Sequence, residues 1–229
     1  MIFLGLAFVS FISFFFSLIF STAFFQNKRW NNIYISLSLL LISLNLFSLF
    51  IGKLFIWYDW MILLFIYSFT LIAPSMFGIV WESLPTIFKK NRKPSYSIIY
   101  ALIYAVLSIT YLINVLYLMG DKVLITAQGV ELQWMKTHLM MYSWLTGIFS
   151  ILFILGCFFL WIRKQGNAWI LLGLGGLLYF FAERMASQSY VNLFIYLFIH
   201  FVLVILLYQG SRRIGEETTP YLQPKNKGR

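Results

Sequence analysis

Residues 2–25 read IFLGLAFVSFISFFFSLIFSTAFF and carry no ionisable side chain. At about 1.5 Å per residue, a helix of this length crosses the roughly 30 Å of hydrocarbon in a bilayer. No positive charge precedes the segment, and it is longer than the apolar core of a signal peptide, so we expect a retained transmembrane helix. Lys28 and Arg29 follow it. Because Lys and Arg concentrate on the cytoplasmic side, the N-terminus is expected to lie outside.

Six further apolar segments predict an all-α, polytopic membrane protein with seven transmembrane helices. Helices are expected because a helix satisfies its backbone hydrogen bonds within a single segment. An odd number of spans places the C-terminus in the cytoplasm, opposite the external N-terminus. The predicted spans are residues 2–25, 32–52, 58–82, 96–119, 138–162, 167–187 and 190–209.

The distribution of Lys and Arg supports this orientation. Thirteen of the 17 basic residues fall in predicted cytoplasmic segments and three in predicted external segments. The remaining one, Arg184, lies near the outer end of the sixth span. Each predicted cytoplasmic segment therefore follows the positive-inside rule. The thirteen are Lys28, Arg29, Lys89, Lys90, Arg92, Lys93, Arg163, Lys164, Arg212, Arg213, Lys225, Lys227 and Arg229.

Composition argues against a soluble globular domain and against a nucleic-acid partner. The chain of 229 residues is 61% hydrophobic and 10% charged, whereas soluble domains are about 45–50% apolar and about 25% charged. The net charge of +10 is concentrated in short blocks between apolar segments. That pattern is typical of topology signals. The single cysteine, Cys157, permits neither an intrachain disulfide nor a cysteine metal site.

The cytoplasmic side is predicted to carry a basic loop at 83–95 and a polar, basic tail at 210–229. The loop charges are expected to act as membrane-surface anchors on anionic headgroups, at about 1 kcal/mol per charge, or as a simple topology signal. The tail is too short for a catalytic domain, so a signalling role would require a protein partner. The basic cluster of the loop consists of Lys89, Lys90, Arg92 and Lys93.

The external loop at 120–137 contains two β-prone runs, at 123–126 and 130–134, which flank Ala127-Gln128-Gly129. This pattern predicts a β-hairpin. The hairpin is expected to cap the helix bundle from outside, either as a bare lid or as a lid that contacts a ligand.

Ionisable side chains within the predicted spans are candidates for function, because placing them in lipid is costly. His200 lies near the middle of the seventh span, where it could bind a ligand, take part in proton transfer or hydrogen-bond a neighbouring helix. Glu183 lies near the outer end of the sixth span and is expected to face inward. The adjacent Arg184 can extend to the interface instead.

The third span contains two further candidates. Pro74 is expected to kink the helix and to free backbone carbonyls, either for a binding site or for packing. Glu82, near the cytoplasmic end, is expected to form a local ion pair with Lys89 or Lys90. The predicted ligand-binding set is therefore His200, Glu183 and Pro74.

The residues required by several cofactors are missing from this pattern, so no cofactor or metal is expected. A retinal Schiff base needs a deep lysine, and the seventh span has none. A bis-histidine haem needs two ligands at one depth, but His200 lies roughly 15 Å deeper than His138 along the helix axis. No His-Glu-x-x-His motif is present. Neither a polar pore stripe nor a filter loop, as an ion channel would show, is evident.

Three features together resemble the seven-helix sensory regions of some bacterial histidine kinases and diguanylate cyclases. The first is the aromatic-rich segment 64–77, which Pro74 interrupts. The second is the stretch 163–213, in which a basic turn is followed by a glycine-containing helix, a tight turn and the last helix. The third is the hairpin between spans four and five. The resemblance implies a module that senses a ligand or membrane state and passes a helix movement inward. It also implies a location in the bacterial inner membrane. Those sensors continue into a cytoplasmic output domain, whereas this chain ends at Arg229.

The sequence favours a non-enzymatic membrane module, either a stand-alone sensor or a subunit of a larger complex, in contact with lipid and with a protein partner. The first alternative is a transporter or channel for a small solute, in which Pro74, Glu183 and His200 would act. The second is a lipid-modifying enzyme with acid–base groups in one cavity. That alternative would use Glu183, His200 and Glu82, although Glu82 is expected near the opposite face from Glu183.

Overall fold

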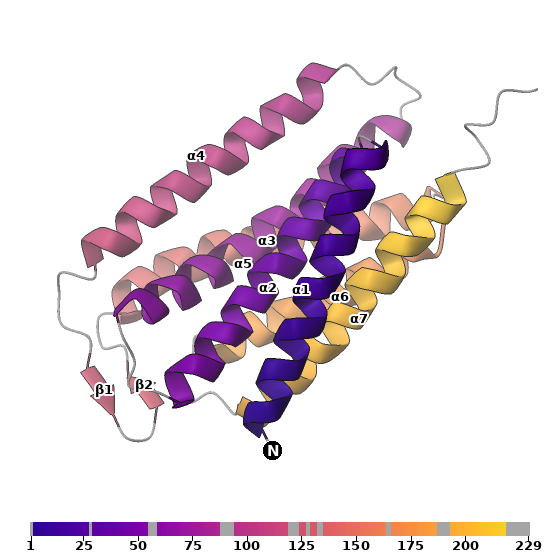
Figure 1. The fold of residues 1–229 in the computed structure, drawn as a ribbon. Coiled ribbons are helices and arrows are strands. Elements are labelled where there is room, and N and C mark those ends of the chain that lie inside the picture. Colours follow the sequence, from indigo (N-terminus) through magenta and orange to yellow (C-terminus); the bar gives the residue numbers. More distant parts are fainter. Residues whose placement is uncertain are drawn as a thin grey trace, which may run out of the picture.

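A computed structural model defines the fold (Figure 1). The backbone is described for residues 2–27, 29–54, 59–87, 94–118, 124–126, 129–131, 135–163, 166–186 and 193–218. Side chains are described for residues 4–27, 29–52, 64–85, 96–113, 144, 146–163, 166–182, 184 and 194–214.

Within these residues the chain forms seven helices and one two-stranded hairpin, in agreement with the all-α class predicted from sequence. The helices are α1 (Ile2–Asn27), α2 (Trp30–Leu54), α3 (Asp59–Ile87), α4 (Pro94–Leu118), α5 (Met135–Ile162), α6 (Ala168–Ala186) and α7 (Leu193–Thr218). The hairpin consists of β1 (Leu124–Thr126) and β2 (Gly129–Glu131).

The last helix is longer than its predicted span. It continues past residue 209 to Thr218, so the first part of the predicted tail is helical. The residues after 209 are polar but compatible with a helix, and the next proline is Pro220.

Six of the helices form two layers. In one layer α1 packs on α2 and α2 on α3; in the other, α7 packs on α6 and α6 on α5. The layers meet where α7 contacts α1 and α2, and where α3 contacts α5 and α6. The fourth helix lies at the edge of this core, against α3 (Figure 1).

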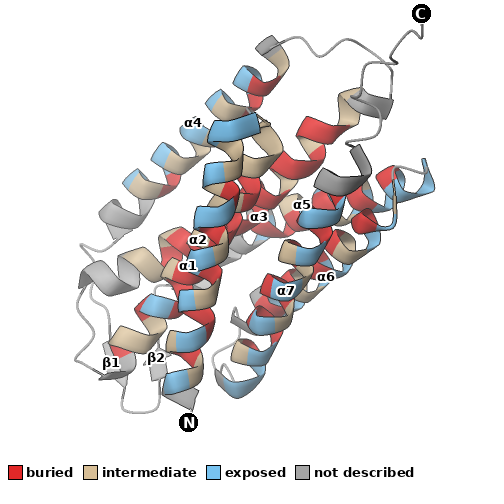
Figure 2. Cartoon of the chain, turned by 45° about the vertical axis from the view of Figure 1, so that its right-hand side comes forward, coloured by how far each residue is buried: buried red, intermediate tan, exposed pale blue. Residues whose placement is uncertain are grey.

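The core is centred on α3, and the outer faces are apolar. Most described residues of α3 are buried, whereas α1 and α4 expose large aliphatic and aromatic side chains (Figure 2). Five helices are long and apolar enough to cross a membrane, and the described parts of α5 and α6 are shorter apolar helices. Outward apolar side chains are stable in lipid, so the chain is a helical, multi-pass membrane protein.

Serine side chains join α1 to α2. Ser13 donates to the carbonyl of Leu39 at 2.6 Å, and Ser17 and Ser36 each donate to the other's carbonyl at 2.9 Å. Ser10 donates to the carbonyl of Ser43 at 2.9 Å. Small residues let two helix backbones approach closely, and their hydroxyls then bond across the interface.

The predicted hairpin is confirmed. Its strands pair antiparallel, with Leu124 opposite Glu131, Ile125 opposite Val130 and Thr126 opposite Gly129. It lies at the end of the bundle where α1 begins, and α7 ends at the opposite end (Figures 1 and 2). The hairpin and the start of the chain therefore share one end of the molecule.

Candidate functional site

The face of α4 that points toward the core carries hydroxyl groups. The opposite face is aliphatic and exposed, as at Leu102 and Val106. A lipid-facing helix with this division presents its polar side to the other helices. We name this inward side the α4 hydroxyl face; it consists of Ser97, Tyr100, Tyr104, Ser108 and Tyr111.

Three hydrogen bonds connect the α4 hydroxyl face to α3 at three depths. Ser97 Oγ donates to Glu82 Oε2 at 2.8 Å, Tyr100 Oη donates to the Pro74 carbonyl at 2.6 Å, and Ser108 Oγ bonds with Tyr67 Oη. The pairs are successive along both helices, so the polar contact runs lengthwise between them. This interface therefore has hydrogen bonds at three positions along its length.

Glu82 is completely buried and faces α4 through its bond with Ser97. A carboxyl group at such a position is costly unless it is hydrogen-bonded, which makes it a candidate for function. Lys89 and Lys90 lie outside the described residues, so the ion pair expected with them stays a prediction.

Tyr34 on α2 packs against two tyrosines of the α4 hydroxyl face, Tyr100 and Tyr104, and we name these three residues the tyrosine cluster. Its ring lies edge-on to those of Tyr100 and Tyr104, with centroids 5.3 and 6.4 Å apart. It reaches them across Gly78 of α3, where an added Cβ would lie 2.5 Å from Tyr34 and 2.9 Å from Tyr100. Only glycine leaves room for both rings at this point.

Two hydroxyls of the cluster have no hydrogen-bond partner among the described residues. They are Tyr34 Oη and Tyr104 Oη, and both atoms are buried. Each phenol can donate one hydrogen bond and accept others. Both groups therefore keep unused hydrogen-bonding capacity within the described part of the structure.

A second polar network joins α2, α3 and α7. Asn45 on α2 is fully buried. Its Nδ2 donates to the carbonyl of Phe65 on α3 at 3.1 Å, and its Oδ1 accepts from Tyr196 Oη on α7 at 2.8 Å. One amide therefore connects three helices from both layers.

His200 lies next to this network. It is fully buried, and its ring packs 4.1 Å from that of Tyr196. Its Nδ1 is 2.9 Å from the Tyr196 carbonyl. A carbonyl only accepts, so Nδ1 carries the proton and Nε2 presents a lone pair, which has no partner among the described residues. The ring is thus fixed by its own helix.

Two of the three residues predicted as a ligand site have described side chains, and their hydrogen-bond contacts differ. Pro74 contacts α4 through Tyr100, whereas the hydrogen bond of His200 is to Tyr196 on its own helix. Two carbonyls of α3 accept hydrogen bonds from tyrosines of neighbouring helices: that of Pro74 from Tyr100, and that of Phe69 from Tyr179 on α6, both at 2.6 Å. The side chain of Glu183 lies outside the described residues, as do the predicted anchors Lys89, Lys90, Arg92 and Lys93.

The sequence interpretation missed the α4 hydroxyl face. The signal was present: positions 97, 100, 104, 108 and 111 follow the spacing of one helix face. It was overlooked because Tyr counts as hydrophobic in composition, although its hydroxyl is polar. The buried amide of Asn45 was noted only as a general helix contact.

Comparison with protein-family models, with curated proteins and with solved structures finds no match for this chain. The candidate site therefore rests on its own geometry. Among the residues that the structure describes, no group of three His, Cys, Asp or Glu side chains is placed to hold a metal ion.

Proposed function

We propose that this chain is a non-enzymatic, sensor-like membrane module in which α4 moves relative to the two-layer core and passes that movement to a protein partner. The observation that carries the proposal is the α4 hydroxyl face, which joins α3 by three hydrogen bonds. The resemblance to the seven-helix sensory regions of bacterial histidine kinases and diguanylate cyclases supports the same function.

The energetics of such contacts suit a helix that shifts. Hydrogen bonds between transmembrane helices contribute about 0.6 kcal/mol each on average, because separated helices find other partners for the same groups. The fourth helix packs at the edge of the core, whereas α3 contacts α2, α5 and α6 besides α4. A ligand then needs only a small difference in affinity between two positions of α4 to favour one of them, and a change in the membrane needs only a small difference in free energy.

The proposed topology has seven spans, an external N-terminus and a cytoplasmic C-terminus, in the bacterial inner membrane. Helix α5 has 28 residues and α6 has 19, which give about 42 and 28 Å of length. Arg163 after α5 and the pair Arg212 and Arg213 in α7 are exposed. They lie at the end of the bundle opposite the start of the chain, where cytoplasmic charges are expected.

The experiment compares the wild type with Tyr100→Phe and Tyr179→Phe. Both tyrosines donate at 2.6 Å to a carbonyl of α3, but only Tyr100 belongs to α4. Each chain is purified gently from native membranes, and bound proteins are quantified by mass spectrometry. We expect a stoichiometric partner whose amount changes several-fold with Tyr100→Phe and not with Tyr179→Phe. A wild-type chain without a partner, or equal effects of both variants, would refute the proposal.

A transporter or channel for a small solute is the second candidate, and the length of the hydroxyl face favours it. The 15 positions from Ser97 to Tyr111 are separated by 14 steps, which cover about 21 Å along the helix axis. The test measures proton and glycerol flux in proteoliposomes, with Ser108→Ala and Tyr67→Phe as variants. Flux above that of empty liposomes that falls in both variants would support transport, and no flux would remove it.

A lipid-modifying enzyme receives the least support from the geometry. Glu82 faces α4, whereas His200 lies beside Tyr196 on α7, so these two acid–base candidates belong to separate networks. Catalysis would require them, or one of them with Glu183, to share a cavity.

A further inference from the structure

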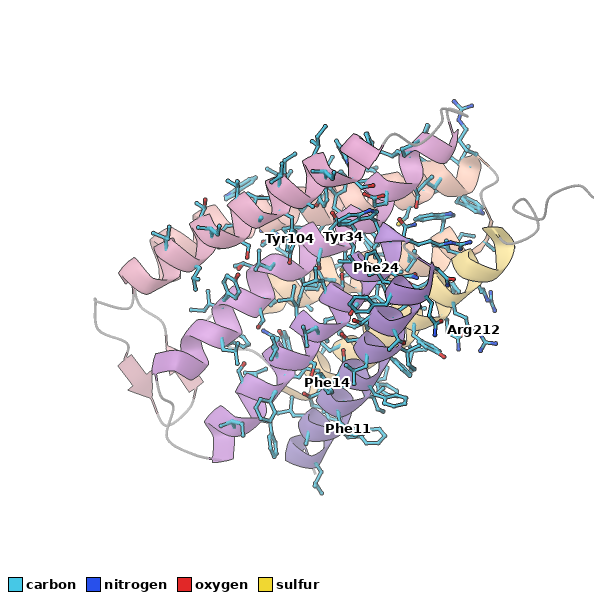
Figure 3. The ribbon with its side chains drawn as sticks, turned by 45° about the horizontal axis from the view of Figure 1, so that its top comes forward. Phe11, Phe14, Phe24, Tyr34, Tyr104 and Arg212 are labelled. Atoms are coloured by element: carbon cyan, nitrogen blue, oxygen red, sulfur yellow. The ribbon has the colours of Figure 1, made fainter. Side chains whose placement is uncertain are left out.

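The phenol side chains of Tyr34 and Tyr104 lie next to each other between α2 and α4, and neither hydroxyl has a hydrogen-bond partner among the described residues. Tyr34 is 2% exposed. The rings lie 6.4 Å apart at an interplanar angle of 69°, and Figure 3 shows the two side chains next to each other. Buried side-chain hydroxyls in folded proteins are usually hydrogen-bonded, so an adjacent pair that is not requires an explanation.

Packing alone does not explain these hydroxyls. Phenylalanine would fill nearly the same space and would avoid burying an unpaired polar group. The neighbouring Tyr100 shows the ordinary arrangement, because its hydroxyl donates to the Pro74 carbonyl. The rings of Tyr100 and Tyr104 lie 5.3 and 6.4 Å from the ring of Tyr34. A ligand that contacts Tyr34 and Tyr104 therefore meets a cluster rather than isolated groups.

The position of the pair defines how a ligand reaches it. Both oxygen atoms are inaccessible from the surface in this structure. The outer face of α4 is aliphatic and exposed, as at Leu102, Ile103 and Val106. A ligand therefore enters from the bilayer when α4 shifts away from α2, and this step rests on the proposed function.

The chemistry of the pair selects a class of ligand. Two phenol O–H groups can donate to one carbonyl oxygen, which has two lone pairs. Neither phenol is charged, which favours a neutral ligand, and entry through lipid favours an apolar one. An aromatic ring lies beside the pair: Tyr100 packs 5.3 Å from Tyr34, and Tyr100 itself packs against Phe77 at 5.8 Å and Trp81 at 5.4 Å. Such surroundings suit a flat ring.

We infer that Tyr34 and Tyr104 form a binding site for a neutral, bilayer-soluble ring carbonyl compound of the quinone class. Each tyrosine donates one hydrogen bond to the same carbonyl oxygen. Binding holds α2 and α4 in a defined separation, so the ligand biases the helix that the proposed function requires to move.

The experiment uses the full chain in lipid nanodiscs and tritiated decyl-benzoquinone as the probe. Decylbenzene, which lacks carbonyl groups, is the matched control ligand. The variants are Tyr34→Phe and Tyr104→Phe, and Tyr208→Phe on α7 is the control variant. We expect saturable quinone binding that weakens at least tenfold in each test variant and is unchanged in Tyr208→Phe. Decylbenzene is expected to partition into the lipid without saturation.

Thermal unfolding separates binding from folding. Removing an unpartnered hydroxyl leaves the midpoint temperature unchanged or raises it, so Tyr34→Phe and Tyr104→Phe should be at least as stable as the wild type. Tyr100→Phe should lower it, because that hydroxyl has a partner. Three results would overturn the inference: quinone uptake that does not saturate, quinone binding by Tyr34→Phe and Tyr104→Phe as tight as that of the wild type, or a lower unfolding midpoint than the wild type in both of these variants.

The failure of this inference differs from the failure of the proposed function. If Tyr100→Phe changes the amount of bound partner but the quinone does not bind, the ligand class is wrong and the sensor proposal stands. If the quinone binds through Tyr34 and Tyr104 but no partner is retained, the site is real and the sensor proposal falls.

Discussion

Asn45 offers the sharpest test of how the two layers are held together. Its amide is fully buried and makes one hydrogen bond to α3 and one to α7. The perturbation is Asn45→Ala, alone and combined with Tyr196→Phe. Because the two side chains contact each other directly at 2.8 Å, their effects on stability should not be additive.

The magnitude follows from which groups lose a partner. Asn45→Ala strands the Tyr196 hydroxyl, at about 1–3 kcal/mol, and removes the bond to Phe65, at about 0.6 kcal/mol. The Phe65 carbonyl keeps a hydrogen bond from Ser68 at 3.1 Å, so it is not stranded. The free energy of unfolding should therefore fall by about 2 to 4 kcal/mol. Adding Tyr196→Phe then removes the stranded hydroxyl and should cost little more.

The assay is reversible unfolding in mixed detergent micelles, followed by far-ultraviolet circular dichroism, for the wild type, both single variants and the double variant. We expect a coupling energy of about 0.6 to 1.7 kcal/mol between the two positions. If Tyr196→Phe lowers the free energy of unfolding equally in the wild type and in Asn45→Ala, to within about 0.3 kcal/mol, Asn45 and Tyr196 do not interact. The account of the second polar network would then be wrong.

Four further predictions follow from particular contacts. Gly78→Ala should destabilise the protein by about 1–3 kcal/mol in thermal unfolding, because the added Cβ would overlap Tyr34 and Tyr100. Gly173→Ala should destabilise it much less, because the atom nearest to the added Cβ would lie 3.4 Å away. Ser13→Ala should cost about 0.6 kcal/mol in the same assay, and Thr22→Ala should be nearly neutral, because its hydroxyl bonds to its own helix at Ile19. His200→Phe should unfold at a higher temperature than His200→Ala. The phenylalanine ring keeps the buried space filled, and the histidine Nε2 that it replaces has no partner among the described residues. Equal midpoint temperatures of the two variants would contradict this. In a Cys157→Ala background, an impermeant maleimide should label Leu4→Cys in intact cells and Arg213→Cys only in opened ones, and the reverse pattern would reject the proposed orientation.

The positions of the helices could be predicted closely from sequence. Residues 2–25 and 32–52 were predicted as spans, and the structure has helices at Ile2–Asn27 and Trp30–Leu54. The reason is that length and hydropathy are local properties, and a bilayer imposes the same length on each crossing. The hairpin was likewise predictable, because Gly129 and the flanking β-prone residues act within one short segment.

The candidate site was predictable only in part. Pro74 and His200 stood out because proline and histidine are unusual inside apolar helices, and both are buried. Their partners could not be assigned, since Tyr100 and Asn45 belong to helices whose neighbours a single sequence does not specify. The α4 hydroxyl face was open to detection, because its spacing is a property of one helix.

The sequence by itself determined that the chain is a helical membrane protein, where its helices run and which segments carry charge. Those features depend on the free energy of each residue in lipid or water, which acts on one segment at a time. Only the tertiary structure decided that α4 lies at the edge of a two-layer core, that Glu82 faces Ser97, and that Tyr34 meets Tyr104. Contacts between helices depend on shape and hydrogen bonding across distant parts of the chain, and many pairings of apolar helices satisfy hydropathy equally well.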